Sequence, residues 1–375
     1  MEAFLRSGRR ILVLAGALVV LAAQAGTSSP AQKIETQKGV VIVRNPVNPV
    51  PRPGGPSRLR LVEELTIGKE EKTDGYLFAG LRSIGVDDKE NIWALDWTDI
   101  KVRIFDKTGK LVNTFGKKGQ GPKEMENPSR MVITPDGNAA ILDLNKIALY
   151  APDGRCLKEL STAKTHPARL RVDRKGFFYL DAFDLRQKKT LSISRFDPDL
   201  KPLVKIAEFA EPFQFGTMNA MITLLYFNLT KADNLVWMST SKYELHIVDP
   251  QGKSLKTVIK DYRPVKITAA DRARILKDRF AGIGNSLKIE FPDAYYPTDF
   301  FLIDDEDRLY ARTYEDDGKG GLWHDVFDAE GRCFTRFSLP KDEMAFVIKK
   351  NKLYALIVEN AEGIPLIKRY AMIWE

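Results

Sequence analysis

The sequence is poor in cysteine and histidine, and beyond its N-terminus it contains no long apolar run. Two cysteines in 375 residues exclude a small scaffold held by disulfides, and 26 glycines exclude a collagen-like chain. The three histidines form no HExxH or Cys/His zinc pattern. No segment after residue 25 is apolar for long enough to span a membrane. The 44% of hydrophobic residues indicates a globular protein with a sizeable core.

Clustered positive charge is also missing. The formal net charge is +8, but this excess is mild and is spread along the chain. A nucleic-acid surface needs Lys and Arg gathered on one face. We therefore expect no nucleic-acid partner.

The first 25 residues have the pattern of a secretory signal. Three arginines precede an apolar stretch from Ile11 to Leu21 and the small-x-small cleavage site Ala23-Gln24-Ala25. We expect the signal to be cleaved and the mature protein to be exported, to the periplasm or the extracellular space. An uncleaved N-terminal anchor is the alternative.

Residues 26–57 are rich in proline. Proline at this density favours an extended, semi-rigid tether over a packed element. Within the tether, Val40 to Val43 has the composition of a short edge strand. The sequence thus predicts three parts, namely a signal peptide (1–25), a Pro-rich tether (26–57) and a folded domain (58–375).

The folded domain contains a repeated unit. Its fullest copy includes IGVDDKENIWALD (residues 84–96) and VRIFDKTGKLV (residues 102–112). These are short β-rich runs separated by turns of Asp, Asn, Gly and Lys, which is typical of a four-stranded antiparallel meander. Further copies begin near residues 131, 170, 229, 301 and 345.

Six such meanders predict an all-β fold, a six-bladed β-propeller of four-stranded antiparallel blades, because only a closed ring buries both faces of each blade. The last copy lacks a fourth strand, and Arg58 to Ile67 has strand character but belongs to no other blade. We expect this segment to close the ring. We also expect one short helical insertion between blades 4 and 5, from Thr268 as N-cap to Phe280.

The unit resembles the NHL/TolB-like six-bladed propeller repeat. The segment FGKKGQGPKEM (residues 115–125) resembles the connection FGxxGxGPGEF of that group, with Lys123 where Gly is usual and Met125 where Phe is usual. Secreted bacterial members of the group are mostly of unknown function. The resemblance therefore implies a fold but no activity.

The long connections of this propeller all fall on one face. Alternation of strand direction places residues 116–128, 259–297 and 313–322 on that face and the short polar turns on the other. Loops that carry function can lengthen on a rigid scaffold. We therefore expect the binding surface on the long-loop face, with the helical insertion either as a partial lid or as a plug of the channel mouth.

Seven residues on that face are candidate ligand-binding residues. Three are arginines at the starts of inner strands, which suit an anionic ligand, and four are aromatic and could stack on a sugar or an apolar group. The arginines are Arg82, Arg130 and Arg169, and the aromatic residues are Trp97, Tyr296, Tyr314 and Trp323. Internal pairing with loop carboxylates (Asp99, Glu124, Asp299) and packing between blades are the alternatives.

Two functional hypotheses follow. The first is an exported, non-catalytic, monomeric propeller without a cofactor that binds a small molecule, peptide, glycan or protein. The second is a hydrolase or lyase of the gluconolactonase/paraoxonase type, with Ca²⁺ or Zn²⁺ held by Asn219, Asp299 and Glu343. No catalytic constellation stands out, so whether the protein is an enzyme stays open.

The two cysteines occupy the same position of the repeat in two different copies. Cys156 belongs to blade 2 and Cys333 to blade 5, and these blades are opposite in a ring of six. A disulfide requires Cα atoms within about 7 Å. We therefore predict two free thiols.

Overall fold

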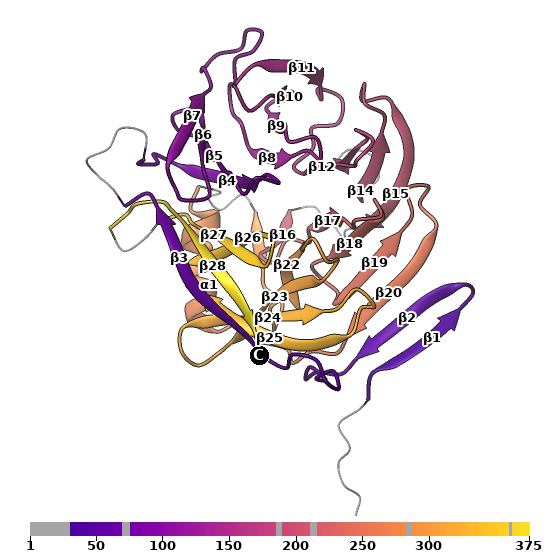
Figure 1. The fold of residues 1–375 in the computed structure, drawn as a ribbon. Coiled ribbons are helices and arrows are strands. Elements are labelled where there is room, and N and C mark those ends of the chain that lie inside the picture. The colour runs from indigo at the N-terminus through magenta and orange to yellow at the C-terminus, as the bar shows by residue number, and fades with distance from the viewer. Residues whose placement is uncertain (1–30, 70–75, 185–189, 211–215, 283–286, 360–361) are drawn as a thin grey trace, which may run out of the picture.

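The computed structural model describes residues 31–69, 76–184, 190–210, 216–282, 287–359 and 362–375. The expected signal peptide lies outside these residues. Six antiparallel sheets surround one axis, which confirms the six-bladed β-propeller (Figure 1). Within the described ranges, no helix has the length and apolarity that a membrane span requires.

In blades 1 to 3 the strands follow one another from the axis outwards in chain order. Blade 1 comprises β4 (Leu81–Val86), β5 (Ile92–Asp96), β6 (Lys101–Phe105) and β7 (Leu111–Phe115). Blade 2 comprises β8 (Arg130–Ile133), β9 (Ala139–Asp143), β10 (Lys146–Tyr150) and β11 (Cys156–Ser161). Blade 3 comprises β12 (Leu170–Val172), β13 (Phe178–Asp184), β14 (Thr190–Phe196) and β15 (Pro202–Ala210).

Blades 4 and 6 recruit strands from the N-terminal part of the chain, whereas blade 5 is formed by four consecutive strands. Blade 4 contains β17 (Leu225–Leu229), β18 (Leu235–Ser239), β19 (Glu244–Val248) and β20 (Ser254–Lys260). Blade 5 contains β22 (Thr298–Ile303), β23 (Leu309–Asp316), β24 (Gly321–Phe327) and β25 (Cys333–Pro340). Blade 6 contains β26 (Glu343–Lys349), β27 (Lys352–Ile357), β28 (Leu366–Trp374) and β3 (Leu59–Ile67).

The ring is closed by β3, as the sequence predicted. It pairs antiparallel with β28 in a register that runs from Leu59 opposite Trp374 to Ile67 opposite Ile367. The N-terminal strand thus supplies the fourth strand of the last blade and covers an edge that would otherwise be unpaired.

The core lies in the seams between blades. Each seam is filled by one apolar cluster drawn from the two neighbouring blades. The inner strands approach so closely at one seam that a Cβ on Gly85 of β4 would lie 2.6 Å from Cγ1 of Ile133 in β8. Tight packing at the seams fixes the inner strands, and therefore the side chains that surround the axis.

The prediction for residues 26–57 is wrong for the part that the structure describes. Residues 31–57 are not an extended, semi-rigid tether throughout, because β1 (Lys33–Gln37) and β2 (Val40–Asn45) form a hairpin and β2 pairs in parallel with β20. Val43 is fully buried in the seam of blades 4 and 5. The run from Val40 to Val43 is the strand that its composition suggested, and it extends the sheet of blade 4.

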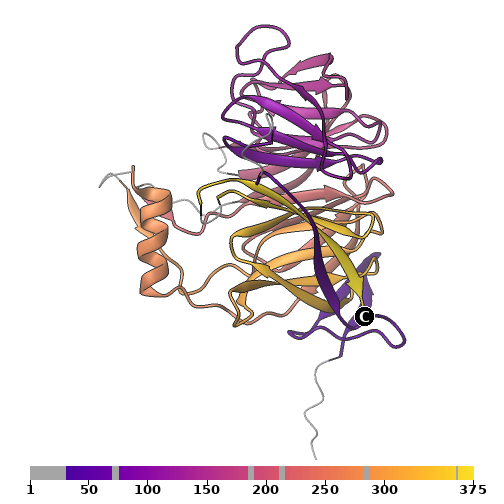
Figure 2. The same cartoon turned by 60° about the vertical axis from the view of Figure 1, so that its left-hand side comes forward.

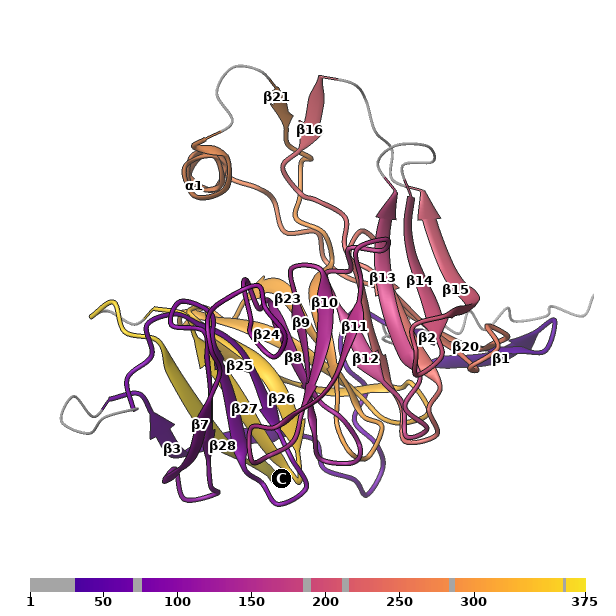
Figure 3. The same ribbon diagram turned by 90° about the horizontal axis from the view of Figure 1, so that it is seen from above.

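Two connections between blades form a small unit on one side of the ring. It contains α1 (Ala269–Phe280) and a parallel pair of strands, β16 (Thr217–Asn219) and β21 (Lys288–Glu290). Thr268 caps α1, as expected, and Ile275 and Phe280 pack against Ala220. Figures 2 and 3 show α1 standing off the ring beside β16 and β21, so it does not plug the channel mouth, and the partial lid stays a prediction.

Candidate functional site

The predicted arginines lie on inner strands of three successive blades. Arg82 is in β4, Arg130 begins β8, and Arg169 directly precedes β12. The strand β8 contacts both β4 and β12. Burial, followed by the neighbouring charges of Arg169 and Arg82, lowers the pKa of the Arg130 guanidinium. The structure therefore brings the three arginines together at the axis.

A fourth arginine, Arg171, belongs to the same group and was missed in the sequence. Burial and the charges of Arg130 and Arg169 lower its pKa to about 10. Its position two residues after Arg169 could have revealed it, because residues i and i+2 of a strand point to the same side. We call Arg82, Arg130, Arg169 and Arg171 the arginine cluster.

A single carboxylate, that of Asp181 in β13, lies among these four guanidinium groups. Its Oδ1 accepts hydrogen bonds from the backbone N–H groups of Ala168 (2.8 Å) and Arg169 (2.7 Å). Its Oδ2 lies 3.3 Å from Nη1 of Arg169. Among the described residues, the side chains of Arg82 and Arg130 form no hydrogen bond or ion pair.

The carboxylates that the sequence offered as alternative partners are paired with other residues. Asp99 pairs with Arg103, Glu124 with Lys117, and Asp299 with Arg312. None of them neutralises the arginine cluster, which therefore keeps a net positive charge.

Aromatic rings flank the cluster on two sides. The ring centroid of Tyr226 in β17 lies 4.1 Å from Cζ of Arg169, and that of Trp97 lies 5.6 Å from Cζ of Arg82. Both contacts are of the cation–π type. Trp97 is 44% exposed, so its ring is accessible from the long-loop face. Tyr226 was not singled out in the sequence, although it occupies an inner strand.

Tyr314 and Tyr296 connect the ring to the small unit that carries α1. The ring of Tyr314 in β23 stacks on Tyr295, with centroids 4.5 Å apart. The hydroxyl of Tyr296 lies 3.2 Å from Nδ2 of Asn219 in β16 and 3.3 Å from Oγ1 of Thr223. These two candidates hold the insertion in place over the long-loop face.

Asp299 in β22 lies between the ring and the insertion. Burial raises its pKa to about 6, although Arg312, at 3.7 Å from its Oδ2, and Arg279 of α1 act in the opposite direction. The second oxygen, Oδ1, is buried without a hydrogen-bond partner among the described residues. Burial and the charge of Asp299 raise the pKa of nearby Tyr314.

The residues proposed as metal ligands do not come together. The carboxylate of Glu343 accepts hydrogen bonds from Lys368 and Tyr370, both at 2.7 Å, within blade 6. Asn219 is bound to the insertion and Asp299 to Arg312. Across the described ranges, no three His, Cys, Asp or Glu residues are grouped so that they could hold a metal ion.

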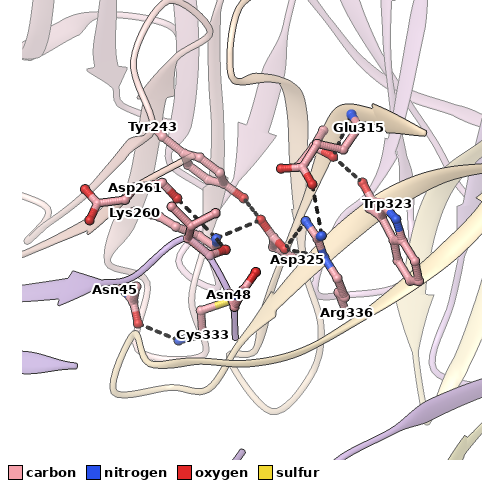
Figure 4. Close-up of polar contacts among 12 residues, drawn as sticks. Asn45, Asn48, Tyr243, Lys260, Asp261, Glu315, Trp323, Asp325, Cys333 and Arg336 are labelled. Carbon is pink, nitrogen blue, oxygen red and sulfur yellow. Dashed lines mark hydrogen bonds and ion pairs between the residues drawn. The ribbon is translucent and has the colours of Figure 1, made fainter. Parts of the chain in front are cut away.

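Trp323 lies in the outer half of blade 5, away from the arginine cluster. The guanidinium of Arg336 in β25 lies over its ring, at 5.1 Å from the centroid. Figure 4 shows the two side chains at one end of a chain of polar contacts that begins at Asn45. The structure therefore does not bring Trp323 together with the other candidates.

That chain of contacts fills the seam of blades 4 and 5, and we call it the seam network (Figure 4). Asp325 is at its centre, with its carboxylate 3.5 Å from Nζ of Lys260 and 3.0 Å from Nη2 of Arg336. Tyr243 donates to Asp325 (2.7 Å), and Arg336 also pairs with Glu315 (3.0 Å).

The N-terminal segment completes the seam network. Nζ of Lys260 donates to the carbonyl oxygens of Val47 (2.6 Å) and Pro46 (3.3 Å). The Asn45 side chain donates to the carbonyl of Gly331 (3.0 Å) and accepts from the backbone N–H of Cys333 (2.7 Å). Both cysteines are free, and they lie in opposite blades as the repeat predicted.

A hollow of about 320 Å³ lies on the opposite face of the ring, between the turns of blades 2 and 3. Its lining includes Asp136, Asp173 and Lys158. Asp173 binds its own turn and Arg195, and Lys158 binds Asp199. Asp173 and Lys158 in this hollow are therefore already paired, unlike Arg82 and Arg130 of the arginine cluster.

Comparison with known families matches residues 71–259, half of the chain, to a family model described as a 6-bladed beta-propeller, DUF5128. The protein belongs to this family. No curated protein matches the chain.

Solved structures of similar fold cover most of the chain at low identity. A protein of Bacteroides fragilis described as a candidate exported protein has a TM-score of 0.55 and 13% identity, over 88% of this chain and 99% of that one. A DUF4221 family member from Bacteroides vulgatus has a TM-score of 0.57 and 12% identity, over 85% and 99%. A gluconolactonase from Xanthomonas campestris has a TM-score of 0.47 and 13% identity, over 84% and 98%. The similarities to the two Bacteroides structures show the fold alone.

Proposed function

We propose that the protein is an exported, non-catalytic propeller that binds an anionic ligand on its long-loop face, through the arginine cluster. The ligand is a small molecule or a charged group of a peptide, glycan or protein, and the protein acts as a monomer. The observation that carries the proposal is the excess of guanidinium groups over carboxylates at the axis.

The charge balance of the cluster supports this function. Four guanidinium groups face the single carboxylate of Asp181, which is bound to Arg169 and to backbone N–H groups. Charges that are held close together and partly desolvated repel each other strongly. An anion placed among them removes this repulsion and gains paired N–H donors.

Two observations support export. The N-terminal residues have a basic region, an apolar stretch and a cleavage pattern. One protein of similar fold is described as a candidate exported protein. Edman sequencing of the protein secreted by its host, with Gly26 as the expected first residue, tests this part of the proposal.

Binding is tested by isothermal titration calorimetry with phosphate, citrate, polyglutamate and a sulfated oligosaccharide at low ionic strength. We expect at least one anion to bind, with an affinity that falls as salt is added. The triple variant Arg82→Gln, Arg130→Gln, Arg169→Gln should lose this binding.

A matched control removes the same charge elsewhere. Arg60, Arg155 and Arg174 are exposed and each pairs with a carboxylate outside the cluster. Replacement of these three by Gln should leave binding unchanged. The proposal is wrong if no anion binds, or if the two triple variants bind equally well.

A further inference from the structure

Around the arginine cluster, side chains that can donate hydrogen bonds have few acceptors. Within the described part of the chain, the guanidinium of Arg130 and the hydroxyl of Tyr226 form no hydrogen bond. The amide oxygen of Asn228 in β17 accepts from Nε of Arg171 (2.9 Å) and from the backbone N–H of Leu229 (3.0 Å). The amide of Asn228 therefore has its NH₂ group left as a donor.

The acceptors in this region are already in use. Asp181 binds two backbone N–H groups and Arg169. Arg171 gives one further hydrogen bond to the carbonyl of Leu170 (2.7 Å), which leaves the rest of its guanidinium fork available. A group that enters this region meets donors and positive charge, and it can satisfy them only with acceptor oxygens.

The available donors come from several sides. Arg130 extends from blade 2, Arg171 from blade 3, and Tyr226 and Asn228 from blade 4. A carboxylate has its two oxygens in one plane, and a single guanidinium fork can satisfy it. Donors on three sides suit the oxygens of a tetrahedral group better.

On the basis of the proposed function, we infer that the arginine cluster binds a phosphate monoester, with Arg130, Arg171, Asn228 and Tyr226 as its donors. A phosphate monoester carries close to two negative charges at neutral pH and three strong acceptor oxygens. Four guanidinium groups against one carboxylate leave an excess of three positive charges, which a dianion reduces more than a carboxylate or a sulfate ester does.

The charge state of the arginines agrees with this inference. Burial and the neighbouring guanidinium groups lower the pKa of both Arg130 and Arg171. Burial is the larger cause, and the neighbouring guanidinium charges that add to it also attract a dianion. Because Arg82 is exposed and Arg130 partly so, an anion can reach the cluster from the long-loop face.

Calorimetry at pH 7.5 with four probes tests the ligand class. Inorganic phosphate and a hexose 6-phosphate are the dianions, and methyl sulfate and acetate are the monoanionic controls. We expect the phosphate probes to bind at least tenfold more tightly than either control. Tighter binding of the hexose phosphate than of inorganic phosphate would identify a phosphorylated sugar, rather than the free ion, as the source.

The variant Asn228→Asp tests the role of the amide. It keeps an acceptor oxygen for Arg171 but replaces the NH₂ donor with a negative oxygen, so the fold should be preserved while the anion site is lost. We expect phosphate binding to weaken about tenfold or more, with no fall in the melting temperature. Asn113→Asp is the control, because Asn113 lies in the outer strand β7 and binds Pro152.

The outcomes separate this inference from the proposed function. If acetate and methyl sulfate bind the cluster as tightly as the phosphates, or if Asn228→Asp binds phosphate like the original protein, the phosphate inference is wrong and the anion-binding function stands. If no anion binds at all, both are wrong.

Discussion

The seam network and the arginine cluster both hold charged side chains inside the ring, but their charges are balanced differently. In the seam network, Lys260 and Arg336 face Asp325 and Glu315, so two positive charges meet two negative ones. The side chains of Lys260 and Asp325 are each 1% exposed. In the arginine cluster, four positive charges meet one negative charge.

The difference teaches that charge balance, rather than burial, separates a structural group from a binding group. Buried charges are tolerated when each has a partner, and the seam network uses them to hold blades 4 and 5 and the N-terminal segment together. The arginine cluster leaves guanidinium groups unpaired and partly exposed, at a cost in stability that an anion would offset. Four predictions test this contrast.

The largest effect is expected from Asp325→Asn in the seam network. Loss of the carboxylate charge leaves Lys260 and Arg336 close together and poorly compensated in a buried seam. Removal of one partner of a buried ion pair costs about 3–5 kcal/mol, and we expect a loss of this size in the free energy of unfolding from urea titration. A loss below about 1 kcal/mol would show that the seam network contributes little to stability, so that it would no longer differ from the arginine cluster as a structural group.

The next effect is expected from Asn45→Ala. Asn45 is 2% exposed, and its amide connects β2 to the carbonyl of Gly331 and the N–H of Cys333. Groups left buried without partners cost about 1–3 kcal/mol each, so we expect a fall of about 2 kcal/mol in urea unfolding. Asn48→Ala is the control because Asn48 binds only the exposed Arg263 among the described residues. If both variants have equally small effects, the N-terminal segment contributes little to stability, as the sequence predicted for a tether.

The sequence predicted the ring because its signals are local and repeated. Alternating apolar residues recur in each blade and Asp-containing turns in blades 1 to 5, and Asp87 shows why, since its Oδ1 accepts the backbone N–H groups of Lys89 and Asn91 at 2.9 Å. Closure by Arg58 to Ile67 also followed, because the last repeat lacked a strand.

The parts that were missed depend on contacts between distant segments. The composition of Val40 to Val43 indicated a strand, but it did not show that this strand pairs with β20 or that β1 forms a hairpin with it. Strand order indicated the face on which Trp323 lies but not its distance from the axis, and it is in the third strand of its blade. The sequence does not show which arginines lack partners, because this depends on where each carboxylate points in the folded structure.

For the arginine cluster, we predict that Arg130→Gln leaves stability unchanged or raises it. The substitution removes a charge that lies among like charges and has no ion pair among the described residues. Relief of such repulsion is worth up to about 1 kcal/mol at a partly exposed site. Thermal melts at low salt measure the effect, which should shrink when salt is added. A clear loss of stability would mean that Arg130 is a structural residue like Lys260.

The last prediction concerns Asp299, the acid between the ring and the insertion. Burial raises its pKa to about 6 from an ordinary value of 3.8, so between these values the folded protein binds more protons than the unfolded chain. Its contribution to stability is therefore greatest below pH 4 and is lost as the pH rises through 6. The melting temperature of the original protein minus that of Asp299→Asn should fall between pH 4 and pH 7. Other titrating groups, such as His324, are common to both proteins and largely cancel in this difference. If this difference in melting temperature stays constant between pH 4 and pH 7, Asp299 is charged at both pH values. Arg312 and Arg279 then compensate its charge as fully as the seam network compensates the charge of Asp325.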